Sequence, residues 1–249
     1  MVDRSPWLTV LSHAVMILGV MVVAFPLYLA LVASTHTAAD IVQAPMPLLP
    51  GGEMWANYKA ALFGSGKLGS NTNVVHMMWV SFVTAIIITV GKIAISLLSA
   101  FAIVYFRFPF KMLCFWAIFL TLMLPVEVRI LPTYKVVADL GLLNTYGGLT
   151  LPLIASATAT FLFRQFFLTV PDELVEAARM DGAGPMRFFK DVLVPLSKTS
   201  IAALFVIQFI YGWNQYLWPL LITTGSDMYT IVAGIKRMST VADTDPQWN

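Results

Sequence analysis

The sequence predicts an all-α fold, a polytopic bundle of transmembrane helices, on three observations. Of its 249 residues, 59% are hydrophobic and 11% are charged, whereas a soluble domain carries about 25% charged residues. The mean hydropathy is +0.80. The charges also leave long stretches empty, and none lies between Arg4 and Asp40. Such a chain cannot cover a globule with ionised groups, so a soluble enzyme and a disordered chain are both excluded.

Charged residues mark the limits of the spans, because each costs roughly 2.5–3.5 kcal/mol at the centre of a helix in the bilayer. Five stretches reach the ~20 residues that a spanning helix needs. They are about residues 10–32, 76–104, 112–132, 142–163 and 199–222. The first is too long for a signal-peptide core and no A-x-A cleavage site follows, so we predict an uncleaved anchor. The second continues through Lys92, which we place inside one long span.

The segments between the spans predict the orientation of the chain. Residues 34–75 are rich in proline and glycine and predict a long external loop with short helical pieces. Residues 107–111 (RFPFK) form a tight basic turn, and residues 164–198 form a long charged loop. Of the lysines and arginines other than Lys92, eight lie on one side and six on the other. This bias and the basic turn predict a cytoplasmic N-terminus and a cytoplasmic 164–198 loop.

The charged loop predicts a short helix–turn–helix outside the membrane. Asp172 suits the positive end of a first helix, Gly182 stops that helix, and Pro185 fits the first turn of a second helix, which Pro195 ends. One face of the first helix carries apolar side chains, at Leu174, Ala177 and Ala178. One interpretation of this hairpin is a solvated connector, and another is a docking surface.

The spacing within the hairpin resembles a known motif. The sequence reads Glu176-Ala177-Ala178, three residues, Gly182, nine residues and Val192-Leu193-Val194-Pro195. It is similar to the EAA loop of ABC importer permeases. The resemblance implies that the loop docks in a groove of a cytoplasmic ATPase subunit and transmits nucleotide-driven closure. The coupling residues that it implies are Glu176, Ala177, Ala178, Asp181, Gly182, Pro185 and Pro195.

Most of the chain resembles the permease subunits of maltose-type carbohydrate importers. The stretches that carry the resemblance are residues 5–13, 121–136, 149–167 and 209–223, and within the family they are most similar to permeases for sn-glycerol-3-phosphate. The resemblance implies a type I ABC importer permease with six spans, so we expect that a sixth span is missing by truncation. It also implies an inner-membrane subunit that works with a homologous permease, an ATPase dimer and a periplasmic binding protein.

The sequence lacks the residues that several other chemistries need. A net charge of +2 is too small to indicate a nucleic-acid partner, and a lone Cys114 excludes an internal disulfide. The glycine cluster at 64–69 lacks the P-loop spacing. The three histidines lack metal-ligand spacing because they are far apart in the sequence, at His13, His36 and His76. We therefore expect no catalytic or metal site in this chain, and ATP and Mg²⁺ bound by the partner ATPase.

Ionisable and amide side chains near or within spans are candidates for the substrate pathway. They are Lys92, Glu127, Arg129, Asn214 and Gln215. Because glycerol-3-phosphate is an anion, one hypothesis is that Lys92 or Arg129 helps to pass its phosphate. The alternative is structural, with Arg129 paired to Glu127 or another span, and Lys92 bonded to a carbonyl or paired with the partner permease.

Other functions remain open from the sequence. An ion-coupled secondary transporter needs ionisable relays across several spans, and a non-conducting membrane scaffold needs none. Within the importer class, the substrate is alternatively a neutral sugar or a glycerophosphodiester. The aromatic run at 211–219 indicates a membrane-interface belt or a packing surface, with sugar stacking as the alternative.

Overall fold

A computed structural model describes residues 6–63, 73–121 and 123–240, so the glycine cluster at 64–69 lies outside the described residues. The chain divides into two compact units, Met1–Val74 with Met238–Asn249, and Val75–Arg237. The described residues form helices and no strands, which confirms the predicted all-α class.

The first unit holds one long helix and a folded polar loop. Helix α1 spans Pro6–Ala33, and the short helices α2 (Ala38–Val42) and α3 (Met54–Phe63) follow. A capping box starts α2, where the Thr37 hydroxyl and backbone N–H both donate to Asp40. These bonds, the hydroxyl first, hold the pKa of the Asp40 carboxyl below its usual value. The Asn57 amide donates to the carbonyls of Ser34 and His36, which ties the loop to α3.

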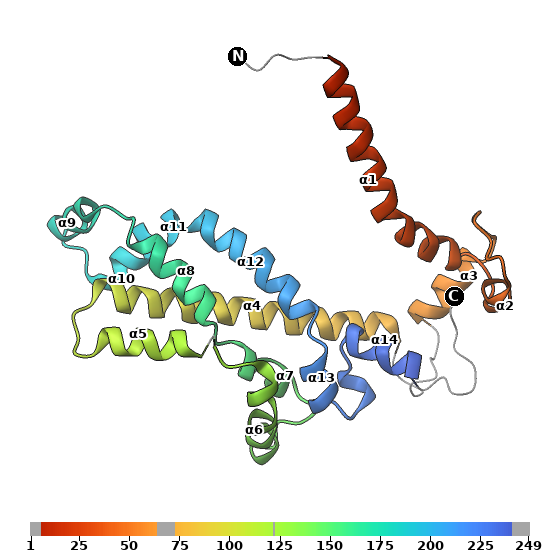
Figure 1. Ribbon diagram of the computed structural model, residues 1–249. Coiled ribbons are helices and arrows are strands. Elements are labelled where there is room, and N and C mark those ends of the chain that lie inside the picture. Colours follow the sequence, from red (N-terminus) through yellow and green to blue (C-terminus); the bar gives the residue numbers. More distant parts are fainter. Residues whose placement is uncertain (1–5, 64–72, 122, 241–249) are drawn as a thin grey trace. The chain divides into compact units, whose positions relative to one another are not determined.

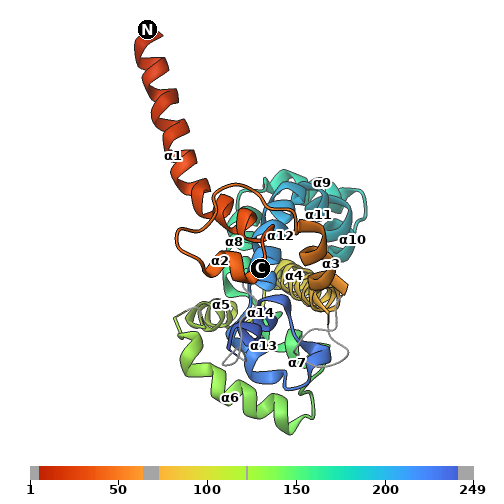
Figure 2. The same ribbon diagram turned by 90° about the vertical axis from the view of Figure 1, so that its right-hand side faces the viewer.

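The second unit is arranged around α4, a 32-residue helix from Val74 to Tyr105 (Figure 1). Helix α12 (Lys198–Trp213) runs along α4 in both views (Figure 1 and Figure 2). The other elements are α5 (Lys111–Leu120), α6 (Val126–Asp139), α7 (Tyr146–Thr150), η1 (Leu151–Leu153), α8 (Ala157–Phe167), α9 (Asp172–Met180), α10 (Pro185–Phe188), η2 (Phe189–Leu193), α11 (Val194–Leu196), α13 (Leu217–Ile222), η3 (Ser226–Met228) and α14 (Ile231–Thr240).

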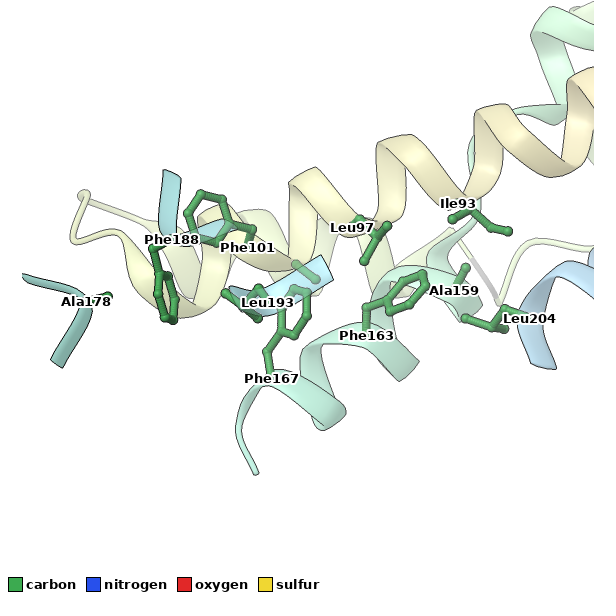
Figure 3. Close-up of a cluster of buried hydrophobic side chains, with 11 residues drawn as sticks. Ile93, Leu97, Phe101, Ala159, Phe163, Phe167, Ala178, Phe188, Leu193 and Leu204 are labelled. Carbon is green, nitrogen blue, oxygen red and sulfur yellow. The ribbon is translucent and has the colours of Figure 1, made fainter. Parts of the chain in front are cut away.

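Two clusters of buried side chains hold this unit together at different ends of α4. The first joins α4, α8, α12 and the 172–193 segment, through Ile93, Leu97, Ala100, Phe101, Ala159, Phe163, Phe167, Ala178, Phe188, Leu193 and Leu204 (Figure 3). The second joins α4 to α6, α7 and α13, through Val80, Ile130, Val137, Leu149, Trp218 and Ile222. Helix α4 is therefore the element through which the two ends of the unit are linked.

Helix α4 covers the second predicted span, including Lys92, without a break. By length and apolar composition, two of the described helices can cross a membrane, α1 and α4, or up to four if each bent pair is one span. The bent pairs are Tyr146–Leu153 with Ala157–Phe167, at 47°, and Pro185–Leu196 with Lys198–Trp213, at 72°. Long hydrophobic stretches in the sequence thus correspond to both straight and broken helices.

In three of the predicted spans the structure has interrupted helices. The predicted 112–132 span is divided between α5, which ends at Leu120, and α6, whose N-cap is Pro125. The predicted 142–163 span breaks at Ser156, whose hydroxyl accepts from the Ala159 N–H and starts α8. The predicted 199–222 span breaks after Trp213, and α13 resumes at Leu217. A hydrophobic window averages over such breaks, whereas caps and missing proline N–H groups end a helix locally.

Candidate functional site

The predicted coupling hairpin is formed by α9 and α10. Asp172 and Glu173 occupy the first turn of α9, and Pro185 is the first residue of α10. Between the helices Gly182 adopts a left-handed conformation, with φ of 71°. The Gly182 N–H donates to the Arg179 carbonyl, and the Ala183 N–H donates to the Ala178 carbonyl. This is the Schellman arrangement, in which glycine ends a helix without a Cβ penalty.

The two alanines of the EAA-like motif face different surroundings. Ala178 is buried in the first core cluster, and Val175 packs against the same cluster one turn earlier. Glu176, Ala177 and Asp181 are exposed. Of the three apolar residues that share a face by their spacing, Leu174, Ala177 and Ala178, only Ala178 is buried. The inner face is set by Val175 and Ala178, which leaves Glu176 and Ala177 on the outer surface.

Aromatic contacts attach the hairpin to the end of α4. The Phe188 and Tyr105 rings lie 5.4 Å apart, and the Phe189 and Phe101 rings lie 4.8 Å apart. The Tyr105 hydroxyl donates to the Phe167 carbonyl at the end of α8, at 3.3 Å. The hairpin is therefore packed against the C-terminal ends of α4 and α8.

The second helix of the hairpin ends within one residue of the predicted end at Pro195. It runs from Pro185 through a π-helical stretch, Phe189–Leu193, to Leu196, so Pro195 lies in its last turn. The Val194 N–H donates to the Phe189 carbonyl, five residues back. A π-bulge accommodates a proline because it shifts the carbonyl that the ring would strike. The chain then bends by 72° into α12.

Lys92, the candidate in the second span, is buried with only 5% of its surface exposed. Its Nζ donates to Gln208 Oε1 at 3.1 Å and lies 3.6 Å from the centre of the Tyr211 ring. Sequence reasoning named Lys92 but missed Gln208 and gave Tyr211 no role beside it. Gln208 is an amide in an otherwise apolar part of α12, and this signal could have identified it.

The other pathway candidates are placed differently. Arg129 is exposed on α6. The side chain of Glu127 lies outside those that the structure describes. Asn214 caps the C-terminus of α12, and the Gln215 amide donates to the Tyr211 carbonyl at 3.1 Å. Of these candidates, the structure places Gln215 against the backbone of Tyr211, the residue that also contacts Lys92.

Comparison with known proteins gives the family. Residues 92–243 match the binding-protein-dependent transport system inner membrane component. The chain belongs to this family. The family's matched region begins at Lys92 and includes both the hairpin and α12. The chain is therefore a membrane-embedded permease, and the predicted resemblance is confirmed.

Curated relatives are similar to this chain over its whole length. The sn-glycerol-3-phosphate transport system permease protein UgpE of Brucella abortus (strain 2308) is 59% identical over 249 residues, covering 100% of this chain and 88% of its own length. The protein of the same name from Escherichia coli O1:K1 is 58% identical with the same coverage.

A solved structure supports the fold. A chain of a bacterial ABC transporter involved in the import of the acidic polysaccharide alginate superposes with a TM-score of 0.77. The match covers 98% of this chain and 85% of that chain, at 23% sequence identity. This similarity establishes the fold of an ABC transporter permease and carries no information on the substrate.

Proposed function

We propose that this chain is the permease subunit of an ATP-driven importer for sn-glycerol-3-phosphate. The identity of 58–59% over the full chain to permeases named for this substrate supports the proposal. The subunit pairs with a homologous permease to form one pathway. A periplasmic binding protein delivers the substrate, and an ATPase dimer in the cytoplasm supplies the energy.

The hairpin couples the ATPase to the membrane helices in this proposal. Its outer surface presents Glu176 and Ala177, and its inner surface is packed against α4 and α8 by Ala178 and Phe188. This continuity of packing is the observation that carries the coupling role. Closure of the ATPase dimer on ATP then moves the hairpin and, through the aromatic contacts, the cytoplasmic end of α4.

The orientation follows from the same assignment. With the hairpin in the cytoplasm, the basic turn at 107–111 lies on the same side, and the N-terminus precedes the first span there. The folded loop of α2 and α3 then faces the periplasm. Cysteine labelling from outside, at position 53 and at position 176, distinguishes this orientation from its inverse.

Uptake in a strain that lacks this subunit tests the function. The strain is complemented with wild type, Glu176→Lys or Glu53→Lys, the last as a control because Glu53 is also an exposed acid but lies in the external loop. Wild type should restore uptake of labelled glycerol-3-phosphate, Glu176→Lys should lower it about tenfold or more, and Glu53→Lys should retain it. Uptake of a neutral sugar only would refute the substrate, and normal transport by Glu176→Lys would refute the coupling role.

A further inference from the structure

The side chains that contact the Lys92 ammonium in the described part of the chain are neutral. An ammonium group has three N–H donors. One is directed to the Gln208 amide oxygen, and the group lies over the face of the Tyr211 ring. Among the side chains that the structure describes, no carboxylate forms an ion pair with Lys92. Within this described set, the partners of the buried cation are an amide dipole and an aromatic ring.

A buried cation without a counter-ion is costly for a purely structural contact. Burial of a charge is compensated well when an opposite charge and further hydrogen bonds accompany it. An anion is the ligand that would complete such a site, because it satisfies the remaining donor and cancels the charge.

The packing of α4 on α12 holds the site in a fixed register. Gly212 lies so close to α4 that a Cβ placed on it would be 3.1 Å from the Ala85 Cα. One helical turn further, Gln208 reaches Lys92, and Leu204 packs in the same core cluster as Ile93. The two helices are thus antiparallel and tightly apposed on both sides of Lys92, so the ammonium has a defined position.

Tyr211 is the exposed member of the group. Tyr211 has 40% of its surface exposed, whereas Gln208 has 7% and Lys92 has 5% exposed. Of the three side chains, the Tyr211 ring is therefore the one that reaches the surface of the subunit, while it also lies against the ammonium. Cation–π contacts of this kind are worth about 0.5–2 kcal/mol, which a dianionic phosphate can readily outcompete.

We propose that Lys92, with Gln208 and Tyr211, forms the site in this subunit that contacts the phosphate of the transported solute. The assignment rests on the proposed function for the solute being a phosphate monoester. In the resting arrangement Gln208 and Tyr211 hold the ammonium, and the phosphate takes their place as it passes. Lys92 thereby favours a phosphorylated solute over its neutral counterpart.

The substitution Gln208→Glu separates this role from a structural one, because the two roles predict opposite results. If Lys92 only ties α4 to α12, a carboxylate in place of the amide strengthens the tie, and uptake is retained. If Lys92 contacts phosphate, the carboxylate neutralises the cation and repels the solute. We expect uptake to fall about tenfold or more, the effect of one lost charge-assisted hydrogen bond, while the unfolding temperature of the purified complex stays equal or rises. Gln165→Glu, an exposed position on α8, is the matched control.

Two substitutions of the lysine complete the experiment. Lys92→Met should lower uptake about tenfold or more and Lys92→Arg should retain more uptake than Lys92→Met, because arginine keeps the charge. Lys135→Met removes an exposed lysine from α6 and should transport normally. Wild-type rates of phosphate-ester uptake by both Gln208→Glu and Lys92→Met would overturn the proposal. If Lys92→Met fails to assemble, the Gln208→Glu result decides between the two roles.

The same assay separates this proposal from the proposed function. Wild-type uptake of labelled glycerol-3-phosphate reports the function, and the ratio of variant to wild type reports the role of Lys92. If wild type imports only a neutral sugar, the function is refuted, and the phosphate site falls with it because it rests on that function. If wild type imports the phosphate ester and both variants do so equally, only the phosphate site is refuted.

Discussion

The coupling hairpin and the Lys92 site use charge in opposite ways. The hairpin exposes its charged side chains, as in the Arg187–Asp191 pair at 70% and 57% exposure, and is held by buried aromatic rings. Lys92 is a single buried charge with polar partners on another helix. Exposed charges add little to the stability of a fold, so the stability of the hairpin depends on its packing. In an apolar interior, electrostatic interactions are stronger, so a buried charge depends on the polar groups that contact it. The hairpin should therefore be sensitive to apolar substitutions, and the Lys92 site to polar ones.

The largest effect is expected where the hairpin meets α4. Phe188→Ala leaves a cavity beside Tyr105 and should destabilise the hairpin by about 3 kcal/mol or more. Uptake should fall to background because the hairpin no longer moves α4. Met186→Ala is the control, since Met186 is on the same short helix and exposed. Thermal unfolding of the purified complex and uptake measure both consequences, and equal behaviour of the two variants would contradict the comparison.

The next effect concerns the turn of the hairpin. Gly182 and Gly184 both have open space where a Cβ would be placed, but Gly182 alone has a positive φ, of 71°. Gly182→Ala should cost about 1–2 kcal/mol in backbone strain, whereas Gly184→Ala should cost about 0.5 kcal/mol or less. The difference in unfolding temperature between the two complexes measures the strain. A larger loss for Gly184→Ala would show that the turn is not the sensitive point.

The hairpin was predictable from sequence because its determinants are local. Asp172, Gly182 and Pro185 each act on the few residues beside them, and the structure places α9, the turn and α10 accordingly. The π-helical stretch before Pro195 was not predicted, and the residues at its ends, Phe188 and Leu193, pack in the core cluster. Local rules carry no information on such tertiary support.

The Lys92 site was predictable only in part, for the converse reason. A lysine in an apolar span stands out by composition, so Lys92 itself was found. Its partner Gln208 lies 116 residues away and meets Lys92 only because α12 packs antiparallel on α4. The broken spans have a similar origin, since the hydrophobic windows were correct in composition but the caps and prolines within them divide the helices. Sequence identified the unusual residue, and the fold identified its surroundings.

A smaller effect is expected at Tyr211, where the ring face meets the lysine. Tyr211→Leu removes the cation–π contact and should change uptake by the equivalent of about 0.5–1 kcal/mol, or about two- to fivefold. Tyr211→Phe keeps the ring and should change uptake less than Tyr211→Leu. The ratio of the two initial uptake rates measures the contribution of the ring. Equal rates would indicate that Tyr211 covers Lys92 sterically, without an electrostatic part.

The smallest effect on stability is expected at the exposed ion pair of the hairpin. Asp191→Asn breaks the contact with Arg187, at 3.5 Å between neighbouring turns, and should change the unfolding free energy by about 0.5 kcal/mol or less. Because both side chains are exposed, salt already screens the pair in the wild type. Uptake should therefore match wild type at both low and high ionic strength. If uptake fell while the unfolding temperature stayed the same, Asp191 would act in docking the ATPase. An exposed charge of the hairpin would then serve binding of the partner and not the stability of the fold.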